Sequence, residues 1–503
     1  MSADNGAVFL AIDAGTGTLK AAVSATGGRL LSRASAPVPY EPQDRDAPFS
    51  RSFETEALWP AIADTVRRAL HDAGVRNGSV AAVGVTSQRQ GIGALDAEGH
   101  DLFLGPNMDL RALFEGLAFD EEHAETVYRL TGHLPSYMLA PVKLRWRQQN
   151  EPDTYERISV VLTVGDWVGH RLTGERALQE TLAAESGLLD VTGGALATPV
   201  LDSLGLRSDC FPPITKPGEV LGALSRDAAD QLGIPPGVPV VVAGPDTQCG
   251  LLAMGAASPG DTGVVAGWSV TTQSVTAAPQ PDPARRTWVG RHVVPQRWVA
   301  EANAGDGGNA YRWLMELLLG PANGGFERME ALAAESPAGA AGAVALLGPA
   351  PLDLSRPGLQ PGGLLFPVPV TFSGLDRARL ARAALENVVF AVRGAADLLF
   401  EVTGVQPAGL AVGGGMTRTA LFARVLADVM SRPVHAAPTP EVSLQGAALA
   451  AEASLEGAGA LDQLALAARD GLREVTPDPV SQHEYQEHYA RWLDAQSRME
   501  GFL

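Results

Sequence analysis

The sequence predicts an α/β fold built from two halves of similar design. Three observations support this prediction. Apolar runs typical of buried strands alternate with segments of helical periodicity, and each half contains a strand, a Gly-rich turn and a returning strand. The chain of 503 residues is also long enough for two large domains. We place the division near 240–262, which gives an N-terminal domain over 1–245 and a C-terminal domain over 246–503.

The N-terminal half opens with three short strands and then alternates. Strand formers fill 8–12, 19–24 and 29–34, with Gly-containing turns between them. The periodicity then predicts a helix over 56–73, a strand over 80–85, helices over 121–130 and 142–149, a strand over 159–163 and a helix over 166–172. No helix follows the first loop and no GxxxxGK[ST] is present, which argues against a P-loop or dinucleotide-binding fold.

The second half repeats this design after a Pro-Pro-Gly turn at 235–237. A buried strand over 238–243 leads into a helix over 247–256, and a strand–turn–strand unit covers 263–276. The remaining predicted elements are a helix over 380–403, a strand over 409–412, a helix over 419–430, a strand over 433–436, a helix over 443–453 and a mostly helical tail over 464–503.

Composition and charge narrow the class of function. Hydrophobic residues make up 46% of the chain and charged residues 19%, which excludes a disordered protein. The net charge of −19 argues against nucleic acid or an anionic membrane surface as a main partner, because both attract clustered Lys and Arg. Cys210 and Cys249 form no CxxC or Cys/His cluster, so we expect no zinc site.

The sequence also argues against secretion and membrane insertion. The segment 1–6 is polar and has no basic stretch before an apolar core, so we expect no signal peptide. The apolar run 336–352 is interrupted by glycines and prolines, so we expect no transmembrane helix. We therefore expect a cytoplasmic protein that binds a small molecule, and we leave open whether it forms a homodimer.

The loop after the first strand is a candidate phosphate site. A strand delivers a carboxylate, and the Gly/Thr turn that follows offers backbone N–H groups and hydroxyls to a phosphate. Asp13 is suited to hold a hydrated magnesium ion. An ordinary hairpin turn is the alternative. The candidate ligands are Asp13, Gly15, Thr16, Gly17, Thr18 and Lys20.

Two further candidates lie at strand ends in the rest of the chain. Asp246 follows a buried strand and opens a helix, where it could deprotonate a hydroxyl group. The alternative for Asp246 is a helix N-cap. Gly413, Gly414 and Gly415 lie between a strand and a helix, and their flat backbone suits a planar ring. A plain loop is the alternative for this triplet.

In their order and spacing, these motifs resemble the FGGY family of carbohydrate kinases over nearly the whole chain. The matching segments are AIDAGTGTLKAAV at 11–23, PVVVAGPDTQCGLLAMGA at 239–256, PGDTGVVAGWSVTT at 259–272, LAVGGGMTRTALFARVLADVMSRPV at 410–434 and SLQGAALAA at 443–451. The resemblance implies two actin-like, ribonuclease-H-like domains with ATP and substrate in an interdomain cleft. It also implies transfer of phosphate from ATP, with Mg²⁺, to a sugar or polyol hydroxyl, and Asp246 as the general base.

One departure from the family lies in its second phosphate motif. Gly267 and Ser269 flank Trp268, where the family usually has Thr, so one phosphate-binding hydroxyl is missing. Ser269 or Thr271 would have to replace it. Two alternative functions share the motifs: an actin-like or chaperone-like ATPase module, and a regulator that binds a sugar or nucleotide with impaired catalysis, which Trp268 favours.

The acceptor is expected to bind in the N-terminal domain. The loop Gln88-Arg89-Gln90 resembles those of glycerol and autoinducer-2 kinases, although Gln90 replaces an acid, and Asn-Met-Asp-Leu-Arg-Ala at 107–112 resembles autoinducer-2 kinases. The resemblance implies that Gln88, Arg89 and Asp109 contact the sugar. A surface salt bridge for Arg89 and a helix N-cap for Asp109 are the alternatives. The identity of the sugar stays open.

Overall fold

The computed structural model describes residues 6–45, 47–75, 79–320, 325–348, 350, 362–368, 375–457 and 459–499. Residues 1–5 of the segment considered for a signal peptide, and residues 349, 351 and 352 of the apolar run 336–352, lie outside these ranges. The chain forms two compact units: the first comprises Met1–Ala257, Thr276–Val299 and Ser443–Arg469, and the second comprises Ser258–Val275, Ala300–Val442 and Asp470–Leu503. The sequence prediction divided the chain once, after residue 245, whereas the first unit also includes two later segments.

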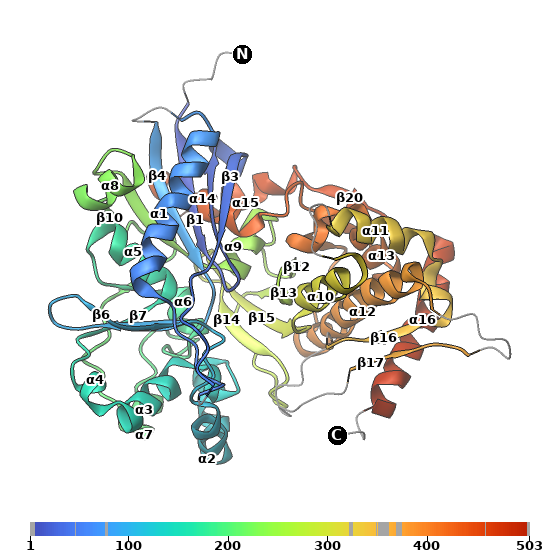
Figure 1. The fold of residues 1–503 in the computed structure, drawn as a ribbon, viewed down its shortest axis with the longest axis horizontal. Helices are drawn as coiled ribbons and strands as arrows, with labels where there is room; N and C mark the ends of the chain where they lie inside the picture. Colours follow the sequence, from blue (N-terminus) through green and yellow to red (C-terminus); the bar gives the residue numbers. More distant parts are fainter. Residues whose placement is uncertain are drawn as a thin grey trace. The chain divides into compact units, whose positions relative to one another are not determined.

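The first unit is built on a six-stranded sheet with the order β10-β11-β4-β1-β2-β3. Figure 1 labels β1, β3, β4 and β10 of this sheet. Its strands are β1 (Val8–Ala14), β2 (Thr18–Ser24), β3 (Leu30–Pro37), β4 (Val80–Ser87), β10 (Gly222–Ala223) and β11 (Pro239–Pro245). The first three strands pair antiparallel, which confirms the predicted strand–turn–strand opening. β1, β4 and β11 are parallel neighbours, so the residues after them meet at one edge of the sheet.

Helices cover this sheet. α1 (Thr55–Asp72) packs against β2 and β3. α14 (Val442–Glu456) comes from late in the chain and packs closely on β4, because a Cβ at Gly84 would lie 2.1 Å from the carbonyl oxygen of Ala447. The other helices around this sheet are α5 (Val164–Thr173), α8 (Arg226–Leu232) and α9 (Asp246–Ala253), and α15 (Ala460–Arg469) packs on α9.

A smaller sheet of order β6-β5-β7 completes the first unit's layers. Only β7 was predicted, because β5 and β6 contain Gly93, Asp101 and Gly105, residue types that are uncommon in strands. The elements are β5 (Ile92–Leu95), β6 (Asp101–Gly105), α2 (Leu113–Thr131), α3 (Ala140–Asn150), α4 (Pro152–Glu156), β7 (Val160–Thr163), β8 (Leu178–Gln179), α6 (Glu180–Glu185), α7 (Thr198–Ser203), β9 (Ile214–Thr215) and β14 (Trp288–Arg291).

In the second unit, six neighbouring strands of one sheet run in the order β15-β13-β12-β18-β19-β20. β12 and β13 form an antiparallel hairpin, whereas β12 and β18 are parallel, so the β12–β13 turn and the end of β18 share an edge. The strands are β12 (Thr262–Ala266), β13 (Val270–Thr276), β15 (Trp298–Asn303), β18 (Leu410–Gly413), β19 (Val434–Ala436) and β20 (Arg473–Val475).

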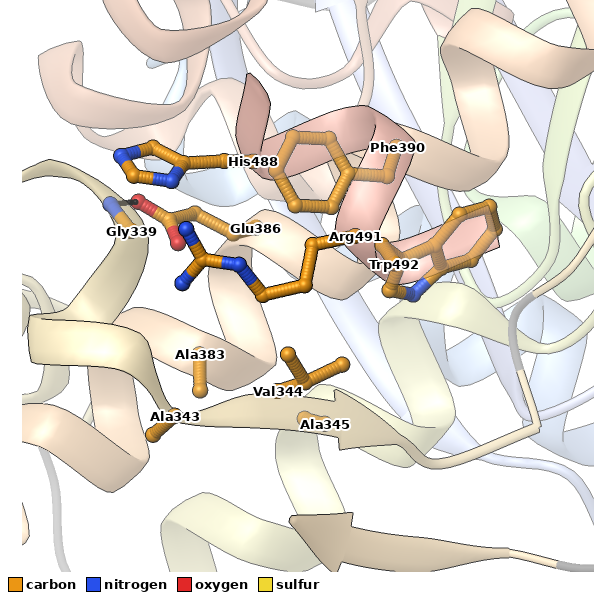
Figure 2. A pocket seen from close by; sticks show the side chains of 10 residues that line it. All are labelled: Gly339, Ala343, Val344, Ala345, Ala383, Glu386, Phe390, His488, Arg491 and Trp492. Carbon is orange, nitrogen blue, oxygen red and sulfur yellow. Dashed lines mark hydrogen bonds between the residues drawn. The ribbon is translucent and has the colours of Figure 1, made fainter. Parts of the chain in front are cut away.

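The helix α12 (Arg377–Thr403) runs through the core of the second unit. It packs against α10 (Gly307–Leu319), α11 (Gly325–Glu335), α13 (Ala420–Met430) and α16 (Pro479–Met499). Figure 2 shows a small cavity beside it that Glu386 lines. One carboxylate oxygen of Glu386 accepts hydrogen bonds from the Gly339 N–H, Arg382 and Tyr485, so this group ties α12 to α16. Within the described ranges, no helix is long and apolar enough to cross a membrane.

Candidate functional site

Two of the predicted carboxylates and Gln88 meet at the edge where β1, β4 and β11 end. Asp13 is the penultimate residue of β1 and pairs in register with Thr86 of β4. Gln88 follows β4 directly, and Asp246 follows β11 directly. Since the three strands are adjacent and parallel, the site residues reach one edge from three points of the sequence. Both carboxylates act electrostatically on buried Cys249, whose pKa burial raises to about 12.

The first loop holds its candidate ligands in a tight turn. Asp13 and Lys20 are register partners across β1 and β2, with 3.8 Å between Asp13 Oδ2 and Lys20 Nζ. Asp13 is only 4% exposed. A Cβ at Gly15 would lie 3.0 Å from the carbonyl oxygen of Thr18, so the turn is compact. A carboxylate beside an ammonium and a Gly/Thr turn offers both a metal ligand and phosphate donors.

Asp246 is the first residue of α9, and it is half-buried. It is not the N-cap, which is Pro245; its Oδ1 accepts a hydrogen bond from the Thr247 N–H at 2.9 Å. The structure therefore does not support the N-cap alternative. A partly exposed carboxylate at the carboxyl end of a strand is placed where α/β proteins bind ligands.

Gln88 ties two loops together. Its Oε1 accepts a hydrogen bond from the Asn107 N–H at 2.8 Å, and its Nε2 donates to the carbonyl oxygen of Gly15 at 3.2 Å. Thr16 Oγ1 also donates to Asn107 Oδ1 at 3.2 Å. The buried Gln88 side chain thus positions the phosphate loop against the 107–112 segment.

Arg89 is buried rather than on the surface. Its Nη1 donates to Glu185 Oε2 at 2.9 Å, and its guanidinium lies 5.3 Å from the ring centroid of Trp288. The salt bridge of the alternative interpretation is therefore present, but it is an interior one. A contact between Arg89 and a sugar stays a prediction.

Asp109 lies with Arg111 rather than with the strand-end group. Both its carboxylate oxygens lie 2.8 Å from Arg111 Nε, and Oδ1 also accepts the Arg51 N–H. The helix that follows is capped by Ala112, so Asp109 is not its N-cap. The pair lies beside Lys143, whose pKa burial lowers to about 8 against the attraction of Asp109. Substrate contact by Asp109 stays a prediction.

Gln90 is a residue whose role the sequence analysis did not identify. It is buried and adopts a φ of +63°, a conformation uncommon for residues other than glycine. Its Nε2 has no hydrogen-bond partner among the described residues, while its carbonyl oxygen accepts from Lys143. An orphaned buried donor next to Arg89 is a group that a ligand hydroxyl could satisfy. The only sequence signal was the replacement of an acid by Gln90.

In the second unit, the glycine triplet lies next to the β12–β13 turn. Gly413 ends β18 and is the register partner of Val265 in β12. Gly414 has a φ of +104°, and a Cβ there would lie 2.6 Å from the carbonyl oxygen of Ala266. A Cβ at Gly415 would have no atom within 4 Å. The triplet thus offers a close backbone approach and an open face.

Trp268 lies at the tip of the β12–β13 turn, between Gly267 and Ser269. Its side chain is 39% exposed, and the Arg312 guanidinium lies 5.5 Å from its ring centroid. Ser269 is half-buried within the turn, whereas Thr271 is fully buried in β13. Of the two hydroxyls proposed to replace the missing Thr, Ser269 is therefore the better placed.

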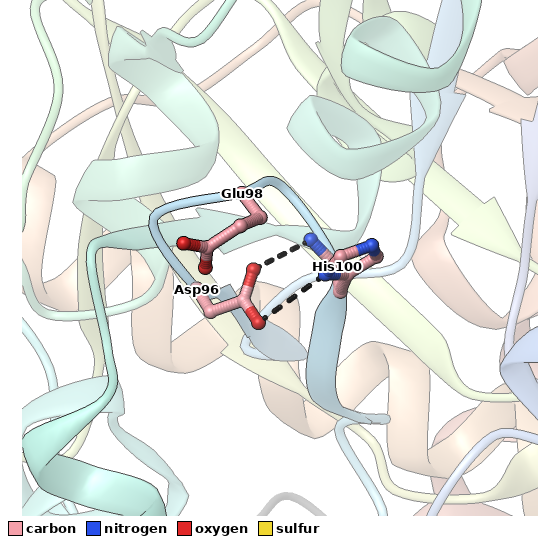
Figure 3. A group of neighbouring side chains, drawn as sticks. All are labelled: Asp96, Glu98 and His100. Atoms are coloured by element: carbon pink, nitrogen blue, oxygen red, sulfur yellow. Dashed lines mark hydrogen bonds and ion pairs between the residues drawn. The ribbon is translucent and has the colours of Figure 1, made fainter.

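A separate acidic group lies on the β5–β6 turn (Figure 3). Asp96 accepts hydrogen bonds from the His100 N–H at 2.8 Å and from Arg157 at 3.1 Å, and Glu98 is exposed beside it. These bonds explain the group as the closure of a hairpin turn.

Known proteins match the chain over nearly its whole length. Residues 8–253 match the FGGY family of carbohydrate kinases, N-terminal domain, and residues 261–455 match the C-terminal domain of that family. Autoinducer-2 kinase of Escherichia coli (strain K12) is 30% identical, and the match covers 96% of this chain and 93% of that protein. Autoinducer-2 kinase of Klebsiella pneumoniae is also 30% identical, over 96% and 92%.

Solved structures agree with this match. Xylulose kinase from Rhodospirillum rubrum has a TM-score of 0.81 at 26% identity, covering 98% of this chain and 99% of that chain. Glycerol kinase from Plasmodium falciparum, with ADP, has a TM-score of 0.81 at 16% identity and shares the fold. This confirms the predicted α/β fold with two actin-like, ribonuclease-H-like domains. The chain belongs to the FGGY family of carbohydrate kinases, and it is a sugar kinase.

Proposed function

We propose that this sugar kinase phosphorylates a hydroxyl group of a small sugar or polyol, with Asp246 as the general base. The observation that carries the proposal is the convergence of Asp13, Gln88 and Asp246 at the edge formed by β1, β4 and β11. Asp246 takes the proton from the acceptor hydroxyl as that oxygen attacks the γ-phosphorus. Phosphoryl transfer depends mostly on positioning and charge stabilisation, and general base catalysis contributes about 10²- to 10⁴-fold.

The nucleotide-side residues fit ATP and magnesium. FGGY kinases use ATP as co-substrate, and Mg²⁺ is typical of them. Asp13 supplies a hard carboxylate ligand for the hydrated ion, which when bound neutralises charge on the phosphates. Gly15, Thr16, Gly17, Thr18 and Lys20 hold the phosphates, as do Gly267 and Ser269, and the open backbone of Gly413, Gly414 and Gly415 holds the adenosine. The close approach of Gly414 to the carbonyl oxygen of Ala266, and the open space at Gly415, support the assignment of the glycine triplet to adenosine.

The acceptor is recognised by Gln88, Arg89, Asp109 and Asp246, and we add Gln90 to this set. The orphaned Nε2 of Gln90 supports a hydrogen bond to a sugar hydroxyl. Relatives named autoinducer-2 kinase are 30% identical, and a neighbour named xylulose kinase is 26% identical. We therefore place autoinducer-2 first among candidate acceptors and xylulose second.

The test measures ADP release with a panel of autoinducer-2, xylulose and glycerol. Asp246→Asn should lower kcat by about 10²- to 10⁴-fold while the KM for ATP stays nearly constant. Asp230→Asn, an exposed aspartate of α8, is the matched control and should behave as the parent. Near-normal turnover of Asp246→Asn would refute the base, and an inert parent would refute the proposed acceptor class.

A further inference from the structure

Glu185 lies at the centre of a buried cluster in the first unit. It is the last residue of α6, and it is 1% exposed. Its carboxylate accepts hydrogen bonds from Arg89 Nη1 at 2.9 Å, from His133 Nε2 at 3.2 Å and from Gln248 Nε2 at 2.6 Å. The three donors come from the loop after β4, the turn after α2 and the helix α9.

The cluster holds the Glu185 carboxylate between the Arg89 guanidinium and the His133 ring. Burial would raise the pKa of Glu185, but the charges and hydrogen bonds of Arg89 and His133 lower it to about 2, so the carboxylate is ionised. His133 Nδ1 lies 2.8 Å from the carbonyl oxygen of Thr131, which can only accept. Both ring nitrogens of His133 thus face oxygen acceptors. Glu185 is the counter-ion of the buried Arg89 guanidinium and the hydrogen-bond partner of the buried His133 ring.

Packing leaves the Glu185 side chain little freedom. The ring centroid of Trp288 lies 5.3 Å from the Arg89 guanidinium and 5.5 Å from the His133 ring. A Cβ at Gly290 would lie 2.1 Å from Glu185 Oε1. The strand β14 can therefore approach the carboxylate this closely only because it has a glycine at this position. Because packing restricts the Glu185 side chain, its carboxylate can hold its hydrogen-bond partners in a defined orientation.

Hydrogen bonds continue from Glu185 to the proposed base. Gln248, which donates to Glu185, accepts at Oε1 from Thr247 Oγ1 at 2.6 Å. The Thr247 N–H in turn donates to Asp246 Oδ1 at 2.9 Å. The other arm of the cluster ends at Arg89, the proposed sugar contact. The Glu185 carboxylate is thus hydrogen-bonded both to Arg89, the proposed sugar contact, and to Gln248 in the first turn of α9.

We propose that Glu185 is a positioning residue that orients Arg89 and the first turn of α9 together, so that acceptor binding and proton removal depend on the same side chain. This inference rests on the proposed roles of Arg89 and Asp246. It predicts a combined defect, because a misplacement of even 1 Å at a reacting group costs about 10²-fold in rate.

The test replaces Glu185 by a side chain of the same shape without charge. Glu185→Gln should raise the acceptor KM and lower kcat, each by about tenfold or more, and change the KM for ATP by less than about twofold. Glu180→Gln is the matched control, because Glu180 is a buried glutamate of the same helix that pairs with Lys216 at 2.6 Å and Arg291 at 3.4 Å. Both variants should lose thermal stability, but only Glu185→Gln should lose acceptor affinity and turnover.

A second variant separates the hydrogen bond to Arg89 from the hydrogen bond to Gln248, and it also serves if Glu185→Gln fails to fold. Gln248→Met removes only the arm to α9, so kcat should fall while the acceptor KM stays within about twofold of the parent. Parent-like kinetics in Glu185→Gln or Gln248→Met would overturn the inference and leave the kinase activity intact. Equal kinetic losses in Glu180→Gln would also overturn it. A parent that phosphorylates no acceptor would refute the proposed function, and this inference with it.

Discussion

Asp166 is a buried carboxyl group whose protonation should control the stability of the first unit. It lies in the first turn of α5, closes a capping box with Thr163 and accepts the Gln179 N–H at 2.8 Å. Its side chain is nearly inaccessible, at 3% exposure. Burial raises its pKa from 3.8 to about 7, although the hydrogen bonds from Thr163 and Gln179 act in the opposite direction.

The sign of the effect follows from proton binding. Because the pKa is higher in the folded state, the folded protein binds more protons between pH 4 and 7, so its stability falls as the pH rises through this range. A shift from 3.8 to about 7 corresponds to about 4 kcal/mol at 1.36 kcal/mol per pH unit. Integration over the titration of Asp166 in the folded and in the unfolded state places roughly 2 kcal/mol of this loss in unfolding free energy between pH 5 and pH 7.

The measurement is urea unfolding of the parent and of Asp166→Asn at pH 5, 6, 7 and 8. Asparagine keeps an acceptor for the cap but cannot ionise, so the stability of the parent relative to the variant should fall by roughly 2 kcal/mol from pH 5 to pH 7. The exposed Asp230→Asn serves as control and should track the parent at every pH. A parent-minus-variant difference that stays flat, within about 0.5 kcal/mol, would show that Asp166 is not protonated in the folded state.

Two further predictions concern the packing of α9 and the second phosphate turn. A Cβ at Gly446 of α14 would lie 1.9 Å from the carbonyl oxygen of Cys249, so Gly446→Ala should displace α9 and lower kcat by at least about tenfold. Gly459→Ala, whose Cβ would meet no atom within 4 Å, should have parent-like kcat, and equal values in the two variants would contradict the packing argument. Trp268→Thr should change kcat by less than the roughly 100-fold typical of one anion-binding donor, because Ser269 remains in the turn. Activity that emerges only in Trp268→Thr would mean that the natural tryptophan blocks catalysis.

The strand ends at the site could be predicted because their signals are local. The runs that become β1, β4 and β11 are continuous stretches of buried residues, and Asp13 and Asp246 follow from position alone. Parallel pairing then brings them together without further information. The hairpin β5–β6 escaped prediction because Gly93, Asp101 and Gly105 interrupt its apolar pattern, whereas β7 is a continuous run of Val, Val, Leu and Thr, equal in length to β5.

The partners of the site residues could not be predicted, because they depend on long-range packing. Arg89 meets Glu185 across 96 positions of sequence, and nothing around Glu185 distinguishes it from an ordinary helix end. Asp109 was expected at the sugar, but whether its carboxylate also holds Arg111 depends on the fold of the segment around Arg51. The packing of α14 in the first unit brings backbone close together at Gly84 and Gly446. A glycine in the sequence does not by itself show which surface will pack against it.

The late arrival of α14 has a consequence for biosynthesis. A ribosome that has released residues up to Ala257 has made all strands of the six-stranded sheet, yet the helix that packs on Gly84 belongs to the segment Ser443–Arg469. Closing so long a loop carries an entropic cost and slows folding. The nascent first unit must therefore wait with one apolar face uncovered until nearly the whole polypeptide has been translated. We expect fragments that stop at Ala257 to aggregate, and co-expression of the segment Ser443–Arg469 to improve their solubility.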